Sequence, residues 1–168
     1  MNVKRLFLVL FLAFSALAGY YSWPDQSLPE GIKADQLVVY KSARRMEFWA
    51  DDKLIKTYHI SLGGNPIGHK QRQGDSRTPE GLYYINDRNP NSGYHLNLGI
   101  SYPNTTDRKR PGNPGGDIKI HGLKNGQGWI GKFQRWRDWT DGCIAVTNEE
   151  MEELYAAVPN GTPILLKP

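Results

Sequence analysis

The single cysteine of this 168-residue chain, Cys143, is the residue whose type and setting most clearly suggest chemistry. It follows Gly142, and the apolar run at residues 144–146 is typical of a strand. A small residue before a nucleophile lets a substrate carbonyl approach the backbone, where main-chain N–H groups can bind an oxyanion. A lone cysteine can equally serve as a small buried hydrophobe. This segment alone leaves both interpretations open.

A cysteine nucleophile needs a base, because a thiol with a pKa of about 8.5 is only a few per cent thiolate at neutral pH. A neighbouring imidazole can take the thiol proton and later deliver it to a leaving amine. The best-placed histidine is His121, which ends a predicted strand and is followed by Gly122. A zinc site built from Cys143 and the histidines lacks the close ligand spacing of zinc motifs, so we predict no metal.

The first 18 residues have the pattern of an export signal. Lys4 and Arg5 precede an apolar run at residues 6–17, and an Ala-x-Ala sequence ends at Ala18. The run is short for a membrane span of about 20 residues, so we predict a signal peptide (residues 1–18) cleaved near Ala18. If it is retained, residues 6–23 would form a single N-terminal anchor.

Export changes the interpretation of Cys143 and of the charge. Cysteines of oxidising compartments usually pair, so a lone exported cysteine favours a reactive role. Without Lys4 and Arg5 the formal net charge falls from +4 to +2. A nearly neutral exported domain is not expected to bind nucleic acid, and a weakly positive one suits an anionic cell-envelope polymer. The basic cluster at residues 107–110 is typical of a solvated loop.

The elements that position these residues are predicted to be mostly strands. Eighteen glycines and eleven prolines favour a loop-rich β fold. Residues 19–34 are expected to be a linker, and residues 35–168 a single domain. Its predicted strands cover residues 36–40, 45–49, 54–62, 82–85, 95–102, 117–121 and 162–167.

Three further segments complete the predicted domain. One α-helix is expected at residues 149–158, after a capping box formed by Thr147 and Glu150. The long Gly/Pro-rich loop at residues 63–81 is expected to be functional or to cover a site. The tryptophan-rich segment at residues 122–139 is expected to form a lid, a sugar-stacking surface or a packing plug.

The pair His121-Gly122, followed by Thr140-Asp141-Gly142-Cys143, resembles the active-site signature of the L,D-transpeptidase catalytic domain family. That signature is a histidine and then, some 14–17 residues later, Ser/Thr-His-Gly-Cys. Further segments similar to the family lie at residues 68–70, 74–81, 100–104 and 114–122, and the likeness covers residues 36–167.

The resemblance implies a mainly β, β-sandwich enzyme with one α-helix near its C-terminus, exported to the periplasm or cell envelope and using no cofactor. By that likeness, Cys143 attacks peptidoglycan stem peptides and passes the thioester to an amine acceptor or to water. The amine could belong to a second stem peptide, giving a 3→3 cross-link, or to an envelope protein. His121 would be the general base and acid, oriented by the carbonyl of Gly122, and the N–H groups of Gly142 and Cys143 would form the oxyanion hole.

Two positions depart from the family pattern. Asp141 stands where the family usually has histidine, and Ala145 where it has arginine or asparagine. An ionised acid near the thiol would raise its pKa, unless it points away and holds a loop. Tyr102 and His95 are candidates for lining the cleft, although a packed aromatic residue and a histidine on a strand face fit the same pattern.

Two other functions remain open. The same site could serve a hydrolase that trims stem peptides or releases proteins linked to them. Because Asp141 opposes thiol activation, a catalytically silent peptidoglycan-binding module is the second alternative.

Overall fold

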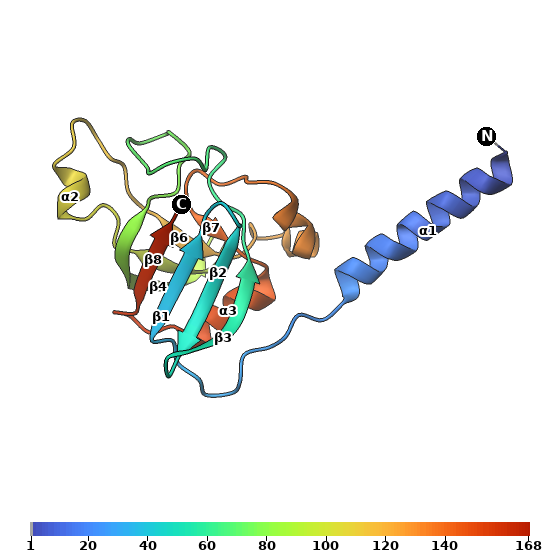
Figure 1. The fold of residues 1–168 in the computed structure, drawn as a ribbon, viewed down its shortest axis with the longest axis horizontal. Helices are drawn as coiled ribbons and strands as arrows, with labels where there is room; N and C mark the ends of the chain where they lie inside the picture. Colours follow the sequence, from blue (N-terminus) through green and yellow to red (C-terminus); the bar gives the residue numbers. More distant parts are fainter. Residues whose placement is uncertain (1) are drawn as a thin grey trace.

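One eight-stranded sheet forms the centre of the computed structural model, which describes residues 2–168 (Figure 1). The strand order across the sheet is β3-β2-β1-β8-β4-β5-β6-β7. The strands are β1 (Gln36–Tyr40), β2 (Arg45–Ala50), β3 (Lys53–His59), β4 (Gly81–Ser92), β5 (His95–Ile100), β6 (Lys119–His121), β7 (Ile144–Ala145) and β8 (Pro163–Lys167). The β1–β8 and β6–β7 pairs are parallel, and the others are antiparallel.

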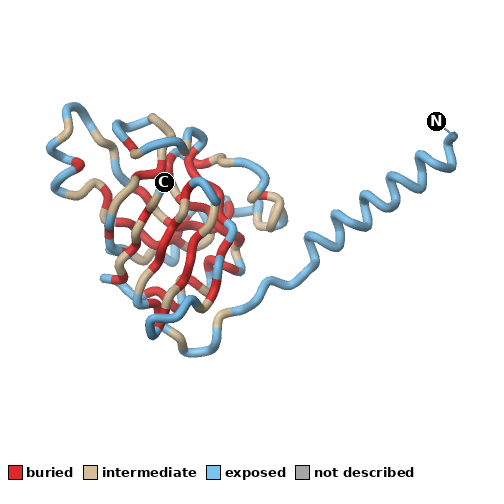
Figure 2. Tube along the Cα trace, viewed as in Figure 1, coloured by how far each residue is buried: buried red, intermediate tan, exposed pale blue. Residues whose placement is uncertain are grey.

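The sheet curls until its two ends meet. After β3 the chain reaches Ser61, whose N–H donates to the Ala145 carbonyl at 3.0 Å, while the Ala145 N–H donates to the Ser61 carbonyl at 2.8 Å. The inward faces bury one continuous apolar core (Figure 2), which includes Leu37, Phe48, Tyr58, Ile60, Tyr83, Leu98, Ile120 and Ile144. The predicted mainly β fold, with one helix on the C-terminal side of the domain, is confirmed.

That helix is α3 (Asn148–Ala157), and it begins at the predicted capping box. Thr147 Oγ1 accepts from the Glu150 N–H, and the Glu150 carboxylate accepts from the Thr147 N–H. These bonds satisfy two main-chain donors that the first turn leaves unpaired. Met151 and Leu154 are fully buried, and the helix contacts β5 and β6. The helix therefore supports the two strands that lead to the candidate site.

The largest difference from the predicted strands is β4, which extends to Ser92 rather than ending near residue 85. Its first part pairs with β8 and its second part with β5, and the register shifts between Ile85 and Asp87. One bent strand therefore belongs to both halves of the sheet, which local alternation could not reveal. Two short helices lie where no helix was predicted: α2 (Thr105–Arg108), at the basic cluster, and η1 (Gly128–Trp136), in the tryptophan-rich segment.

The N-terminal apolar segment is a helix, α1 (Val3–Ser22), which projects away from the domain (Figure 1). All twenty of its residues are exposed. By length and composition it could cross a membrane. The helix continues past Ala18, the predicted end of the signal peptide.

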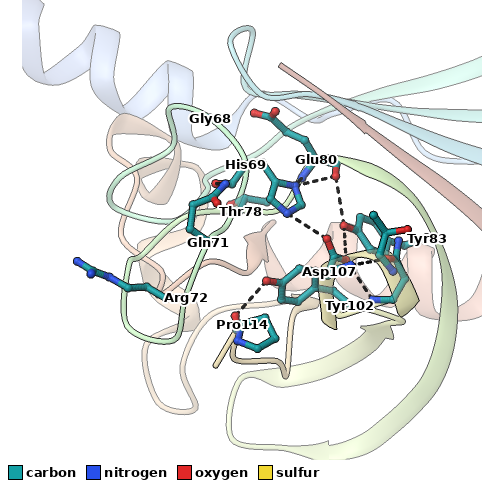
Figure 3. Close-up of polar contacts among 12 residues, drawn as sticks. Gly68, His69, Gln71, Arg72, Thr78, Glu80, Tyr83, Tyr102, Asp107 and Pro114 are labelled. Atoms are coloured by element: carbon teal, nitrogen blue, oxygen red, sulfur yellow. Dashed lines mark hydrogen bonds and ion pairs between the residues drawn. The ribbon is translucent and has the colours of Figure 1, made fainter. Parts of the chain in front are cut away.

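A buried polar network centred on Asp107 joins the loop at residues 63–81 to the segment that contains α2 (Figure 3). The Asp107 carboxylate accepts from the Tyr83 hydroxyl at 2.9 Å and from the Asn104 N–H at 3.0 Å. His69 Nε2, from the loop at residues 63–81, lies 3.1 Å from the same carboxylate. Asp107 thus fixes the start of the loop that runs from α2 to β6.

Replacing Asp107 by asparagine is expected to reduce the free energy of unfolding by about 1–3 kcal/mol, the usual cost of leaving a buried polar partner unsatisfied. Urea denaturation of the two proteins measures the difference. Asp87 is exposed, so Asp87→Asn is the matched control and is expected to change stability by no more than about 0.5 kcal/mol. Equal stability of the two variants would contradict a stabilising role for the Asp107 network.

Candidate active site

His121 ends strand β6, and Cys143 directly precedes the neighbouring parallel strand β7. Ile120 lies opposite Ile144 in the register. Side chains alternate along a strand, so Ile120 and Ile144 share the core face. Their neighbours His121 and Cys143 share the other face. Cys143 and His121 both line a cleft of about 480 Å³.

His121 is held in one tautomer. Its Nδ1 lies 2.7 Å from the Gly122 carbonyl oxygen, which can only accept, so Nδ1 carries the proton and Nε2 keeps a free lone pair. The rings of Tyr94 and Trp139 pack against the imidazole, with centroid distances of 4.8 and 5.6 Å. Burial lowers the pKa of His121, the bond to the Gly122 carbonyl opposes that change, and the Lys119 charge adds to it. The imidazole is therefore available as a neutral base.

Gly122 is held in a space that admits no side chain. A Cβ at this position would lie 2.7 Å from Asn148 Oδ1 and 3.0 Å from the Cβ of His95. Asn148, the first residue of α3, also accepts from the Leu123 N–H at 2.9 Å. The helix thus holds the turn whose carbonyl orients His121. Asn148 was not among the site residues predicted from sequence, because its position directly after the capping residue Thr147 indicates only the start of a helix.

The Cys143 thiol is neutral at rest. Its Sγ donates to the Asp117 carbonyl at 3.6 Å. Burial raises the pKa of the thiol, and the Lys119 N–H and ammonium group oppose this. The charges of Asp117 and Asp141 raise the pKa further. A neutral thiol and a neutral imidazole that line the same cleft suit deprotonation by a general base during attack, rather than a preformed ion pair.

The turn before the cysteine is closed by the Thr140 hydroxyl. Thr140 Oγ1 accepts from the Gly142 N–H at 3.2 Å and donates to the Cys143 carbonyl at 2.7 Å. Gly142 has φ +132°, and a Cβ there would lie 2.6 Å from the Arg77 carbonyl oxygen, so only glycine fits. In this structure the Gly142 N–H serves the turn rather than pointing unpaired into the cleft.

Asp141 is exposed and lines the same cleft as Cys143. It also borders an adjoining hollow together with Lys70, Gln73 and Asn113. The two hollows share Gly116, Asp117 and Asp141. Asp141 is thus placed between them.

Replacing Asp141 by asparagine is expected to lower the pKa of the Cys143 thiol, because it removes one of the negative charges that raise it. Alkylation by iodoacetamide at neutral pH should accelerate by up to about fivefold, the range expected for one exposed charge. Mass spectrometry of the modified protein over time measures the rate. Asp87→Asn, an exposed acid outside the residues that line the cleft, is the control, and an unchanged rate in Asp141→Asn would contradict the expectation.

Two of the residues considered from sequence lie away from the cleft lining. Tyr102 is buried, donates to the Pro114 carbonyl at 3.0 Å and packs edge-on against Tyr83 in the Asp107 network (Figure 3). His95 Nε2 lies 2.9 Å from a Glu152 carboxylate oxygen on α3. The β4–β5 hairpin lines the cleft with other residues, namely Asn89, Asn91, Ser92, Gly93, Tyr94 and Asn97. Their polar composition was visible in the sequence, but the cleft they join depends on strand pairing.

Comparison with known proteins agrees with this geometry. The profile of the L,D-transpeptidase catalytic domain (YkuD) matches residues 34–166. YafK of Escherichia coli K12, named as a candidate L,D-transpeptidase, is 30% identical over an alignment of 127 residues that covers 71% of this chain and 45% of YafK. A Bacillus licheniformis protein with a similar designation, YkuD, is 29% identical over 148 residues, covering 82% of this chain and 72% of that protein. The chain therefore spans about half the length of YafK.

Solved structures show the same fold. The helical cell shape determining protein Pgp2 of Campylobacter jejuni aligns with a TM-score of 0.58 and 25% identity, over 78% of this chain and 46% of that protein. An L,D-transpeptidase of Mycobacterium smegmatis aligns with a TM-score of 0.55 and 16% identity, over 79% of this chain and 58% of that one. With the profile match over most of its length, this chain belongs to the L,D-transpeptidase catalytic domain family.

Proposed function

We propose that this protein is a peptidoglycan L,D-transpeptidase of the cell envelope, with Cys143 as nucleophile and His121 as general base and acid. The observation that carries the proposal is the juxtaposition of the two residues at the ends of adjacent strands, lining one cleft, with His121 Nε2 free to accept a proton. Family membership supports the same substrate class, peptidoglycan stem peptides. A role in cell shape, as in the name of the Campylobacter jejuni relative, is consistent with that substrate.

The first half-reaction forms a thioester. His121 Nε2 takes the Cys143 proton as the sulfur attacks the carbonyl carbon of the bond between the third residue of the stem and the D-residue after it. When the C–N bond breaks, the same proton passes to the departing amine nitrogen. Because burial lowers the pKa of His121, the imidazolium gives up this proton readily.

The second half-reaction returns the enzyme to its starting state. An acceptor amine attacks the thioester, His121 removes its proton, and that proton returns to the departing Cys143 sulfur. The negative oxygen formed in each half-reaction would be stabilised by the main-chain N–H of Cys143. The N–H of Gly142 would join it by exchanging its 3.2 Å bond to Thr140 for one to the substrate.

Two alternative functions differ from this proposal, one in the acceptor and the other in having no catalytic activity. Water in place of the amine would make the enzyme a hydrolase of the same bonds. A silent binding module is favoured by one observation, the raised pKa of Cys143, to which Asp141 contributes.

Incubation of the full chain in detergent with a muropeptide bearing a tetrapeptide stem tests these functions. Intact-protein mass spectrometry detects the acyl-enzyme, and product mass spectrometry identifies the acceptor. Dimeric products together with an adduct on Cys143 are expected. Shortened monomers alone would assign a hydrolase. No adduct, and no difference from Cys143→Ala, would leave the binding module.

A further inference from the structure

The end of the N-terminal helix is packed against η1. The ring of Tyr21 stacks on Phe133 with a centroid distance of 5.4 Å, and its hydroxyl donates to the Trp129 carbonyl at 2.8 Å. Gly131, with φ +47°, leaves room for the Tyr21 ring, because a Cβ there would lie 2.9 Å from Tyr21 Cε2. The last turn of α1 therefore packs against η1.

Ion pairs fix the chain just after the helix. Asp25 lies 3.2 Å from Lys132 Nζ and 2.9 Å from Arg135 Nη2. Arg135 also pairs at 2.8 Å with Glu150, in the first turn of α3. The start of the predicted linker at residues 19–34 is thus tied through η1 to the body of the domain.

Three tryptophans around this contact face solvent. The exposed fractions are 74% for Trp23, 74% for Trp129 and 63% for Trp136. Tyr20 lies among them, 6.5 Å from the Trp136 ring. Such large apolar surface is costly in water, whereas tryptophan and tyrosine are enriched at the membrane–water interface, where an apolar body and a polar tip are both accommodated. We call Trp23, Trp129 and Trp136 the aromatic collar.

The helix beyond the collar has the dimensions of a membrane span. Its 20 residues rise about 30 Å, the thickness of the hydrocarbon core of a bilayer. Lys4 and Arg5 mark the opposite end, as the preference for positive charge on the cytoplasmic side requires for an external domain. The Ala18–Gly19 bond lies inside the helix, whereas proteolysis is concentrated at exposed loops and termini.

We propose that α1 is a retained membrane anchor and that the aromatic collar rests in the headgroup region of the bilayer. The partner of this surface is the lipid bilayer itself. Trp139, three residues after the end of η1, lines the catalytic cleft, so the collar holds that cleft near the membrane surface. The proposal is independent of the chemistry at Cys143.

Two measurements on the full chain test the anchor and the collar. Intact mass spectrometry of protein from the membrane fraction is expected to show a chain that includes α1; a chain beginning near Gly19 would overturn the anchor. The second measurement uses phosphatidylethanolamine–phosphatidylglycerol vesicles containing lipid brominated near the headgroup end of its acyl chains, which quenches nearby tryptophan fluorescence.

Single tryptophan substitutions show which tryptophans the brominated lipid quenches. Trp129→Phe and Trp136→Phe are each expected to remove part of the quenched fluorescence, whereas Trp49→Phe, on β2, is expected to remove only unquenched fluorescence. Loss of quenched signal to the same extent in all three, or in none, would overturn the collar.

Tyr21 provides a further pair of variants for the packing of the helix on η1. Tyr21→Ala is expected to reduce collar quenching while the chain stays in the membrane, because the ring that positions η1 is lost. Tyr21→Phe keeps the stacked ring and is expected to retain most of the quenching. Unchanged quenching in Tyr21→Ala would show that the contact does not position the collar.

Discussion

Cys143→Ala is expected to abolish acyl-enzyme formation and to lower kcat by about 10⁴–10⁶, the effect of removing the nucleophile in enzymes that act through a covalent intermediate. The thioester cannot form without the sulfur, so neither transpeptidation nor hydrolysis should remain. Cys143→Ser is expected to be nearly as inactive. Its hydroxyl can still donate to the Asp117 carbonyl, but an alcohol is a far weaker acid and nucleophile than a thiol.

Single-turnover mass spectrometry with the tetrapeptide muropeptide measures this loss. The melting temperature of each variant serves as the folding control, because the side chain is small and sits at the cleft. Substantial turnover in Cys143→Ala with the wild-type melting temperature would exclude Cys143 as the nucleophile and require another residue of the cleft to form the intermediate.

His121→Asn is expected to lower kcat by about 10²–10⁴, the usual contribution of general acid–base catalysis. Asparagine can still donate to the Gly122 carbonyl, so the turn is preserved while the base is lost. His95→Asn is the matched control. His95 has φ +65°, which asparagine adopts more readily than most residues, and it faces α3 rather than the cleft.

The pH dependence gives a second test of the same residue. Only neutral imidazole can accept the thiol proton, so kcat/KM should fall as pH drops through the pKa of His121. Because burial lowers that pKa, the acid limb of the profile is expected below the ordinary histidine value of about 6.5. His95→Asn should keep this limb, and His121→Asn should lose it along with most of the rate. An acid limb retained in His121→Asn would assign it to another group.

The neutral resting state of the thiol also suits the proposed location in the cell envelope. Oxidation proceeds through the thiolate, so the raised pKa of Cys143 reduces the fraction open to oxidation between turnovers. A cysteine activated only when a substrate is present keeps its reactivity in an oxidising envelope. The neutral pair of Cys143 and His121 is therefore compatible with both the proposed catalysis and the proposed export.

The sequence by itself determined the features that depend on neighbouring residues. Short strand-like segments and the Thr147–Glu150 capping box predicted β1, β2 and α3 to within a residue or two, because these patterns and caps are local. The spacing of His121-Gly122 and Thr140-Asp141-Gly142-Cys143 identified the family, which the profile match confirms. The parallel β6–β7 pair brings both segments of that motif together in one register.

Only the tertiary structure decided which other residues line the cleft with the proposed catalytic pair, Cys143 and His121. Tyr102 and the β4–β5 hairpin have similar polar and aromatic sequence character, yet the hairpin lines the cleft and Tyr102 packs in the Asp107 network. The bend in β4 and the closure of the sheet at Ser61 and Ala145 determine which of these residues reach the cleft. Both are long-range pairings, whose free energy comes from residues distant in the chain and leaves no local pattern. The same reason hid the packing of Tyr21 on Phe133, which joins residues more than a hundred positions apart.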